Sequence, residues 1–110
     1  MIYEIRTYRL KTGAVADYIR AVSSEGIEIQ KPHLGTLIGY YYSEIGQLNE
    51  IVHIWSYSSL DDREKRRTAL AADPRWVSFL PKIQCLIETM NNKILKPFPF
   101  IEEQLGQRSL

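Results

Sequence analysis

The chain has 110 residues, of which 45% are hydrophobic and 25% charged, and this fits one globular domain with its own core. A formal net charge of +1 lacks the positive excess of dedicated nucleic-acid binders, so we expect no nucleic-acid partner. The single cysteine, Cys85, excludes an internal disulfide framework and fits a reducing compartment. No apolar run is long enough for a membrane span, so we expect a soluble, cytoplasmic protein.

The first predicted elements are a strand over residues 2–10, rich in β-branched and aromatic side chains, and a helix after it. Thr12 is the candidate N-cap of that helix. The helix is expected to end near Gln30, because Pro32 pushes the residue before it out of the α region. Its apolar stripe, with spacings of three and four, comprises Val15, Tyr18, Ile19, Val22, Gly26 and Ile29.

Strands over residues 36–43 and 49–57 are predicted next, joined by a hairpin that turns at Gly46-Gln47. This turn places Tyr40 opposite His53, and directly opposed residues share a face of the sheet. One face then carries Leu37, Gly39, Tyr41, Val52 and Ile54. The other face carries Ile38, Tyr40, Tyr42, Ile51, His53, Trp55 and Tyr57, with Ile38 opposite Trp55.

The second half of the chain predicts helices and a last strand. Ser59 and the carboxylate of Asp62 form a capping box for a helix that reaches about residue 72. Asp73 and Pro74 suit the start of a further helix, and a strand is expected over residues 90–96. The order strand–helix–strand–strand–helix–strand predicts an α+β domain with an antiparallel sheet over residues 1–96. Residues 97–110 are expected to be a C-terminal tail, extended or docked on a partner.

The two faces of the sheet predict where a partner and a ligand bind. The aliphatic face of Val52 and Ile54 suits the helices, whereas a bare aromatic face would exceed the apolar patch that monomers tolerate. We therefore expect a homodimer in which two aromatic faces meet around a cavity. A charged pair is not expected beneath helices, so Glu4 and Arg6 are placed on this aromatic face. The candidate ligand-binding residues are Glu4, Arg6, Tyr8, Tyr40, His53, Trp55 and Tyr57.

The chemistry of these candidates leaves more than one hypothesis. His53 can act as an acid, a base or a ligand, or it can be a structural histidine bonded to a neighbouring tyrosine or backbone group. No other soft ligand has suitable spacing from His53, so we expect no metal and no cofactor. Arg63 and Arg67 lie one helical turn apart and are expected to clamp a local carboxylate, in a structural role. Two hypotheses for the function remain. In the first, the chain binds or transforms a small, mostly apolar molecule; in the second, it is a non-catalytic dimerisation or adaptor module.

Several runs of the sequence resemble the NIPSNAP family. They are the opening MIYEIRTY, the run GQLNEIVHIWSY over residues 46–57, and DPRW over residues 73–76. The resemblance spans about residues 1–98 and implies a ferredoxin-like subunit that pairs into a dimeric α/β barrel, with no settled reaction. The absence of an arginine-rich N-terminal extension favours a compact bacterial-type member. Related barrels include cofactor-independent monooxygenases and haem-handling enzymes, an analogy of fold that names no substrate and leaves haem binding through His53 as an alternative to the expectation of no cofactor.

Overall fold

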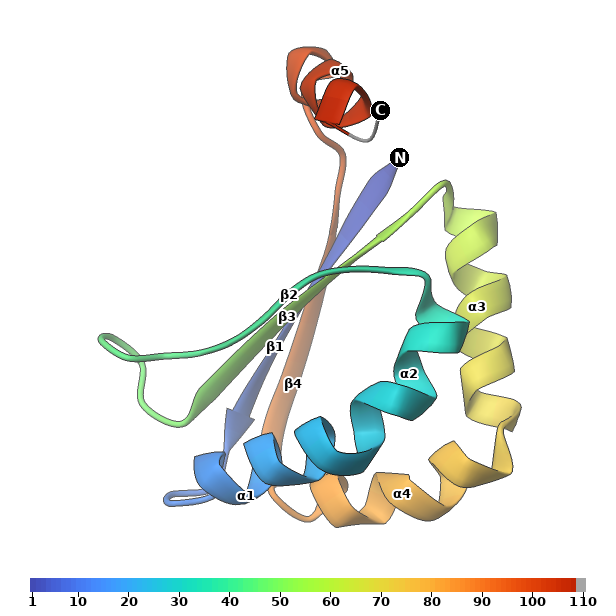
Figure 1. Ribbon diagram of the computed structural model, residues 1–110. Coiled ribbons are helices and arrows are strands. Elements are labelled where there is room, and N and C mark those ends of the chain that lie inside the picture. The colour runs from blue at the N-terminus through green and yellow to red at the C-terminus, as the bar shows by residue number, and fades with distance from the viewer. Residues whose placement is uncertain (109–110) are drawn as a thin grey trace.

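A computed structural model describes residues 1–108, and the surroundings of side chains for residues 1–104. Helices pack on one face of a four-stranded antiparallel sheet with the order β2-β3-β1-β4, as Figure 1 shows. The strands are β1 (Ile2–Leu10), β2 (Thr36–Tyr42), β3 (Glu50–Tyr57) and β4 (Ile87–Leu95). The helices are α1 (Val15–Ala21), η1 (Val22–Gly26), α2 (Ile27–Leu34), α3 (Leu60–Ala72), α4 (Pro74–Gln84) and α5 (Pro99–Arg108). The predicted α+β class is confirmed, and the connectivity is ferredoxin-like.

The first helical segment is longer than predicted and contains a π-helical turn, η1, between α1 and α2. It begins at Val15 after Ala14, without the side-chain cap expected from Thr12. It continues past Gln30 to Leu34, with Pro32 inside its last turns. A proline removes only one helical hydrogen bond. The helix ends at Gly35, whose φ of +80° a residue with a side chain rarely adopts.

The predicted starts of the next two helices are confirmed. The Ser59 hydroxyl accepts a hydrogen bond from the Asp62 N–H at the start of α3. The Asp73 carboxylate accepts one from the Arg75 N–H at the start of α4. Strand β4 begins three residues earlier than predicted, because it pairs with β1 along almost its whole length. Such pairing outweighs the weak strand propensity of Asn91 and Asn92.

The predicted register of the β2–β3 hairpin is confirmed near the turn and fails further away. Tyr40 lies opposite His53. The register then shifts between Leu37 and Gly39, so that Leu37 lies opposite Trp55 in place of Ile38. The irregularity inserts one residue into β2. Leu37 consequently faces the helices, while Ile38 is 46% exposed.

The prediction of which sheet face the helices cover was wrong. Glu4, Tyr8, His53, Trp55 and Tyr57 are all buried under the helices, with exposures between 0% and 6%. Val52 and Ile54 lie on the open face and are only partly buried. The prediction assumed that a charged pair cannot lie beneath helices. Helix α3 removes this obstacle, because it supplies arginines that neutralise the buried carboxylate of Glu4.

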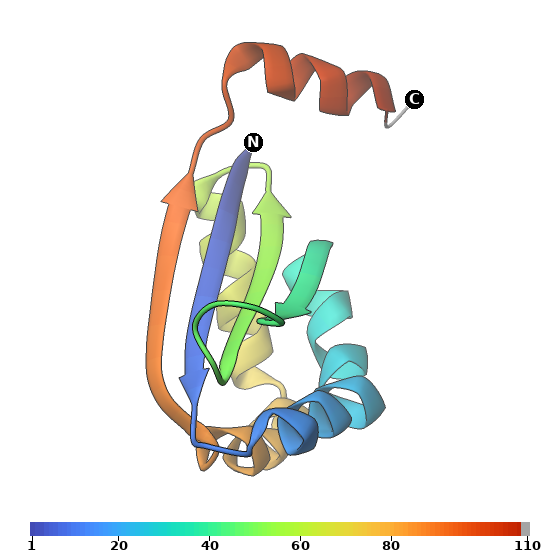
Figure 2. The same cartoon turned by 90° about the vertical axis from the view of Figure 1, so that its left-hand side faces the viewer.

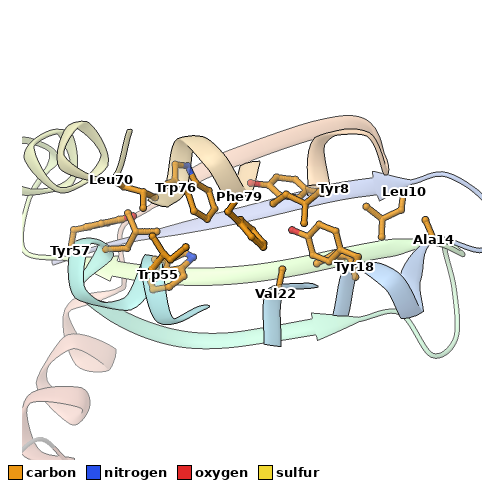
Figure 3. Close-up of a cluster of buried hydrophobic side chains, with 14 of the residues drawn as sticks. Tyr8, Leu10, Ala14, Tyr18, Val22, Trp55, Tyr57, Leu70, Trp76 and Phe79 are labelled. Carbon is orange, nitrogen blue, oxygen red and sulfur yellow. The ribbon is translucent and has the colours of Figure 1, made fainter. Parts of the chain in front are cut away.

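The core fills the space between the sheet and helices α1, η1, α2, α3 and α4, and Figure 3 shows its main side chains. Trp76 and Phe79 of α4 pack together, with ring centroids 5.5 Å apart. The ring of Phe79 also lies against the backbone of η1 at Gly26. A Cβ atom at Gly26 would be 2.7 Å from this ring, so only glycine permits the contact.

The C-terminal segment forms a helix where an extended tail was expected. Pro99 begins α5 and Glu102 lies in its first turn, and both residue types favour the start of a helix. Figures 1 and 2 show α5 projecting beyond the end of the sheet near the N-terminus. There Glu102 forms an exposed ion pair with the N-terminal amino group of Met1, at 3.4 Å. Residues 109–110 of the predicted tail lie outside the described residues.

Candidate functional site

The carboxylate of Glu4 is fully buried between the sheet and α3, where several donors surround it. Arg63 donates to Oε2 from Nε and Nη2, at 3.1 and 2.7 Å. Arg6 donates to the same oxygen at 3.2 Å, and Arg67 donates to Oε1 at 3.4 Å. The remaining donors are the Tyr57 hydroxyl at 3.2 Å and the Asn92 amide at 3.0 Å. Arg63 and Arg67 thus clamp a carboxylate as predicted, but it is the distant Glu4 of β1 and not a local carboxylate.

These contacts decide the ionisation of Glu4. Burial alone raises its pKa, but the hydrogen bonds from Arg63 and Asn92 and the charges of Arg67 and Arg6 outweigh it, and the pKa falls to about 2. Glu4 is therefore ionised at neutral pH. The three guanidinium groups of Arg6, Arg63 and Arg67, here called the arginine cluster, exceed its single negative charge by two.

His53 lies next to the charged residues around Glu4, among aromatic side chains between the sheet and the helices. Its Nδ1 accepts a hydrogen bond from the indole N–H of Trp55 at 2.8 Å. The ring of Tyr40 stacks on it at 4.4 Å, and the ring of Tyr8 meets it edge-on at 5.0 Å. Burial and the positive charge of Arg6 lower the pKa of His53 to about 3. At neutral pH His53 is an uncharged hydrogen-bond donor through Nε2, not an acid or base ready to exchange protons.

Between the sheet and the helices, four buried polar atoms have no hydrogen-bond partner within the residues that the structure describes. They are the hydroxyls of Tyr18 and Tyr40, Oε1 of Gln30 and Nε2 of His53. Burial raises the pKa of Tyr40 to about 12, and interactions with the side chains of Tyr18 and Gln30 oppose this rise. Figure 3 shows Tyr8 of β1 and Tyr18 of α1 reaching into the same space. Unpartnered buried groups are costly, and each one calls for an explanation.

A hollow of about 250 Å³ lies between the first helical segment and the edge strand β2, in front of the rings of Tyr18 and Tyr40. Its wall is mostly apolar. The lining residues are Tyr18, Ile19, Val22, Ser23, Ile27, Leu37, Tyr40, Tyr41, Tyr42 and Ile51. A π-helical turn contributes Val22 and Ser23 to this wall, and such turns occur frequently at functional sites.

Comparison with known proteins assigns the chain to a family. The NIPSNAP family model matches residues 3–102. The chain belongs to the NIPSNAP family. A NIPSNAP family protein of unknown function from Agrobacterium tumefaciens shares 67% sequence identity, with a TM-score of 0.89 over 91% of this chain and 90% of that chain. The site described above therefore belongs to a NIPSNAP protein.

Two more distant proteins resemble this chain, one over part of its own length and the other in fold. The NipSnap homolog of Dictyostelium discoideum is 32% identical over 96 residues, which are 87% of this chain and 42% of that protein. The chain thus spans less than half the length of this curated relative. A putative antibiotic biosynthesis monooxygenase from Nitrosomonas europaea is 12% identical, with a TM-score of 0.64 over 89% of this chain and 99% of its own. At this identity the likeness shows a shared fold alone.

The structure brings the predicted site residues of this NIPSNAP protein together, but on the helix-covered face. Glu4, Arg6 and Tyr57 belong to the charged group, and Tyr40, His53 and Trp55 to the aromatic group. Tyr8 joins the two groups, because its hydroxyl accepts a hydrogen bond from Arg6 at 2.6 Å. None of these side chains was correctly placed relative to the helices.

Sequence reasoning missed three residues of the site: Tyr18, Gln30 and Asn92. Tyr18 was assigned to the apolar stripe, although a buried tyrosine needs a partner for its hydroxyl. Gln30 lies on the same inward side of the helical segment and is 5% exposed. A signal for a polar sheet face was present in α3, where Leu70 is the one buried residue. A helix with so few apolar residues needs polar partners on the sheet beneath it.

The structure also bears on metals and membranes. Among residues 1–108, no group of three or more histidine, cysteine, aspartate or glutamate side chains is placed to hold a metal ion. None of the helices described has the combined length and apolar character needed to cross a membrane.

Proposed function

We propose that this NIPSNAP protein binds or transforms a small, mostly apolar molecule in the hollow between η1 and β2. The observation that carries the proposal is that Tyr18 and Tyr40, whose buried hydroxyls have no hydrogen-bond partner within the described residues, both line the hollow. An apolar hollow with a few converging polar groups is the usual composition of a small-molecule site. A ligand whose polar tip reached these groups would remove the cost of leaving them unpaired.

Ligand-induced stabilisation tests this proposal. The probe is 1-tetralone, a bicyclic molecule with one carbonyl oxygen, since a cavity of about 150 Å³ already holds benzene. At a hundred times its dissociation constant, a ligand stabilises the folded protein by about 2.7 kcal/mol. Ser23→Phe should fill the hollow and abolish the rise in the unfolding temperature. Ser24→Phe is the matched control, because the neighbouring Ser24 does not line the hollow.

The second candidate function is a dimerisation module that uses the open face of the sheet. On β1 and β3, side by side, lie Tyr3, Ile5, Val52 and Ile54, and none of the described helices covers them. We infer that a second copy covers this face by two-fold symmetry. The interface then involves the aliphatic face in place of the aromatic one, and leaves the hollow on the opposite side of the sheet.

Sedimentation velocity distinguishes the dimer from a monomer. The unmodified chain should sediment with twice the mass of one copy, and Ile54→Glu should shift it to the mass of one. Ile45→Glu makes the same chemical change in the β2–β3 loop, where Ile45 is 94% exposed, and should leave the dimer intact. A chain that stays monomeric at every concentration contradicts the dimer and leaves the binding proposal untouched.

A further inference from the structure

We infer that the arginine cluster forms a second binding site, which takes an organic monocarboxylate with an apolar body. This inference is independent of the proposed function. The hollow borders β2, whereas the Glu4 carboxylate that the arginine cluster surrounds is bonded to Asn92 of β4, and these two strands are the opposite edges of the sheet.

The charge balance of the cluster is the first argument. The side chains of Arg6, Arg63 and Arg67 are only 13%, 21% and 25% exposed. Within the described residues, Glu4 is the one carboxylate in ion-pair contact with any of them. The nearby carboxylate of Asp62 pairs with Arg66 instead. Partly buried charges are normally paired, so two positive charges here lack a counterion.

The free donors of Arg67 are the second argument. Arg63 directs both Nε and Nη2 to Glu4, whereas Arg67 makes one long contact through Nη1 at 3.4 Å. Arg67 is also within hydrogen-bonding reach of the Tyr57 hydroxyl, and no further bond from its Nε or Nη2 is present among residues 1–104. Arg67 is also the most exposed member of the cluster. A guanidinium that keeps unused N–H groups can donate to the oxygens of a second carboxylate.

The inward side of β4 supplies the apolar part of the site. Tyr8 lies opposite Met90 and Glu4 opposite Ile94, so Met90 and Ile94 border the cluster on the helix side of the sheet. They are nevertheless 53% and 39% exposed. In Figure 2, β4 stands at the edge of the sheet, beside α3 and not beneath it. A cationic end next to uncovered apolar side chains favours an amphipathic anion over inorganic phosphate.

Titration with octanoate tests the site, because octanoate combines one carboxylate with a flexible apolar chain. Its affinity should fall at least tenfold in Arg67→Gln and by an intermediate amount in Arg67→Lys, which keeps the charge and loses the planar fork. Arg20→Gln is the matched control, since Arg20 is 73% exposed and pairs with Asp17, three residues earlier in the chain. 1-Octanol, which has the same chain length and no charge, should bind without any dependence on Arg67.

Two outcomes would overturn the inference: equal octanoate affinity in Arg67→Gln and the unmodified chain, or equal affinity for octanoate and 1-octanol. Backbone amide chemical shifts separate the two sites. Octanoate should perturb Arg67 and Asn92, whereas a molecule in the hollow should perturb Ile19 and Leu37. A failure with 1-tetralone therefore counts against the proposed function alone.

Discussion

The indole N–H of Trp55 donates to Nδ1 of His53 over 2.8 Å, two residues away on the same strand. Because Nδ1 accepts this bond, the single proton of the neutral imidazole must reside on Nε2. The other surroundings of His53 are the stacked ring of Tyr40 and the edge of Tyr8. Trp55 thereby sets which hydrogen-bonding groups the interior of the protein presents.

Trp55→Phe should allow the imidazole of His53 to adopt either neutral tautomer. The variant leaves a buried acceptor unsatisfied, which costs about 1–3 kcal/mol of stability in addition to any loss of packing. Imidazole ¹⁵N chemical shifts should show a single Nε2–H form in the unmodified chain and a mixture of tautomers in the variant. Trp76→Phe, in the core but away from His53, should leave the imidazole shifts unchanged.

Stability should fall as the pH drops from 6.5, the ordinary pKa of histidine, toward the pKa of about 3 that His53 has in the folded state. In this window the unfolded chain binds a proton that the folded chain cannot accept. The slope is at most about 1.4 kcal/mol per pH unit for one group. Urea unfolding between pH 6.5 and 4.5 should show this decline, and His53→Gln should flatten it. An equal slope in both proteins would mean that His53 is not the group responsible.

Glu4→Gln should be strongly destabilising, by about 3–5 kcal/mol, because it leaves the arginine cluster without its one negative charge. The pKa of Glu4, about 2 against an ordinary value of 4.5, means that its stabilising effect is complete above pH 4.5 and is lost below it. Chemical unfolding at pH 7 measures the cost. Glu102→Gln serves as the comparison, because its ion pair is exposed and should contribute little.

Gly26→Ala should destabilise the protein by about 1–3 kcal/mol, since the new methyl group overpacks against the ring of Phe79. Phe79→Leu is destabilising in its own right, through the space it leaves. In the double variant the methyl group occupies part of that space. The loss of stability in the double variant should therefore be smaller than the sum of the losses in the two single variants. Additive costs in this double-mutant cycle would show that the contact is not the cause.

The stability cost of removing a tyrosine hydroxyl should depend on whether that hydroxyl has a hydrogen-bond partner. Tyr40→Phe should be neutral or slightly stabilising, because its hydroxyl is buried without a partner. Tyr8→Phe should cost about 1.5–3 kcal/mol, since its hydroxyl accepts a charged hydrogen bond from Arg6. Thermal unfolding of the two variants makes the comparison, and an equal cost for both would contradict it.

The strand assignments and the pairing of Tyr40 with His53 could be predicted from sequence, because both depend on local alternation and turn length. The grouping of His53, Trp55 and Tyr57 on one face followed from the same pattern. Which face meets the helices could not be predicted this way, because it depends on contacts between residues distant in the chain. Glu4 and Arg63 are 59 residues apart, and each makes burial of the other possible.

The candidate site was only partly predictable for a related reason. Residue type identified His53 and its aromatic neighbours, but the hollow depends on where the first helical segment crosses β2. That crossing places Tyr18 and Ser23 in the wall, and neither residue has a pattern that sets it apart from ordinary core or surface positions. The register shift at Ile38 likewise has no marker in the composition of β2.

The number of residues in the π-helical turn determines how α2 is oriented against the sheet. A buried stripe recurs along the first helical segment every four residues, at Ala14, Tyr18, Val22, Gly26, Gln30 and Leu34, and Ile29 is buried next to this stripe. In a regular α-helix, four residues turn the chain by about 400°, so such a stripe would drift by about 40° at each step. The wider turn at η1 takes up part of this drift. Removal of one residue from η1 would therefore rotate α2 against the sheet, while removal of a residue from the β2–β3 loop would leave this packing unchanged.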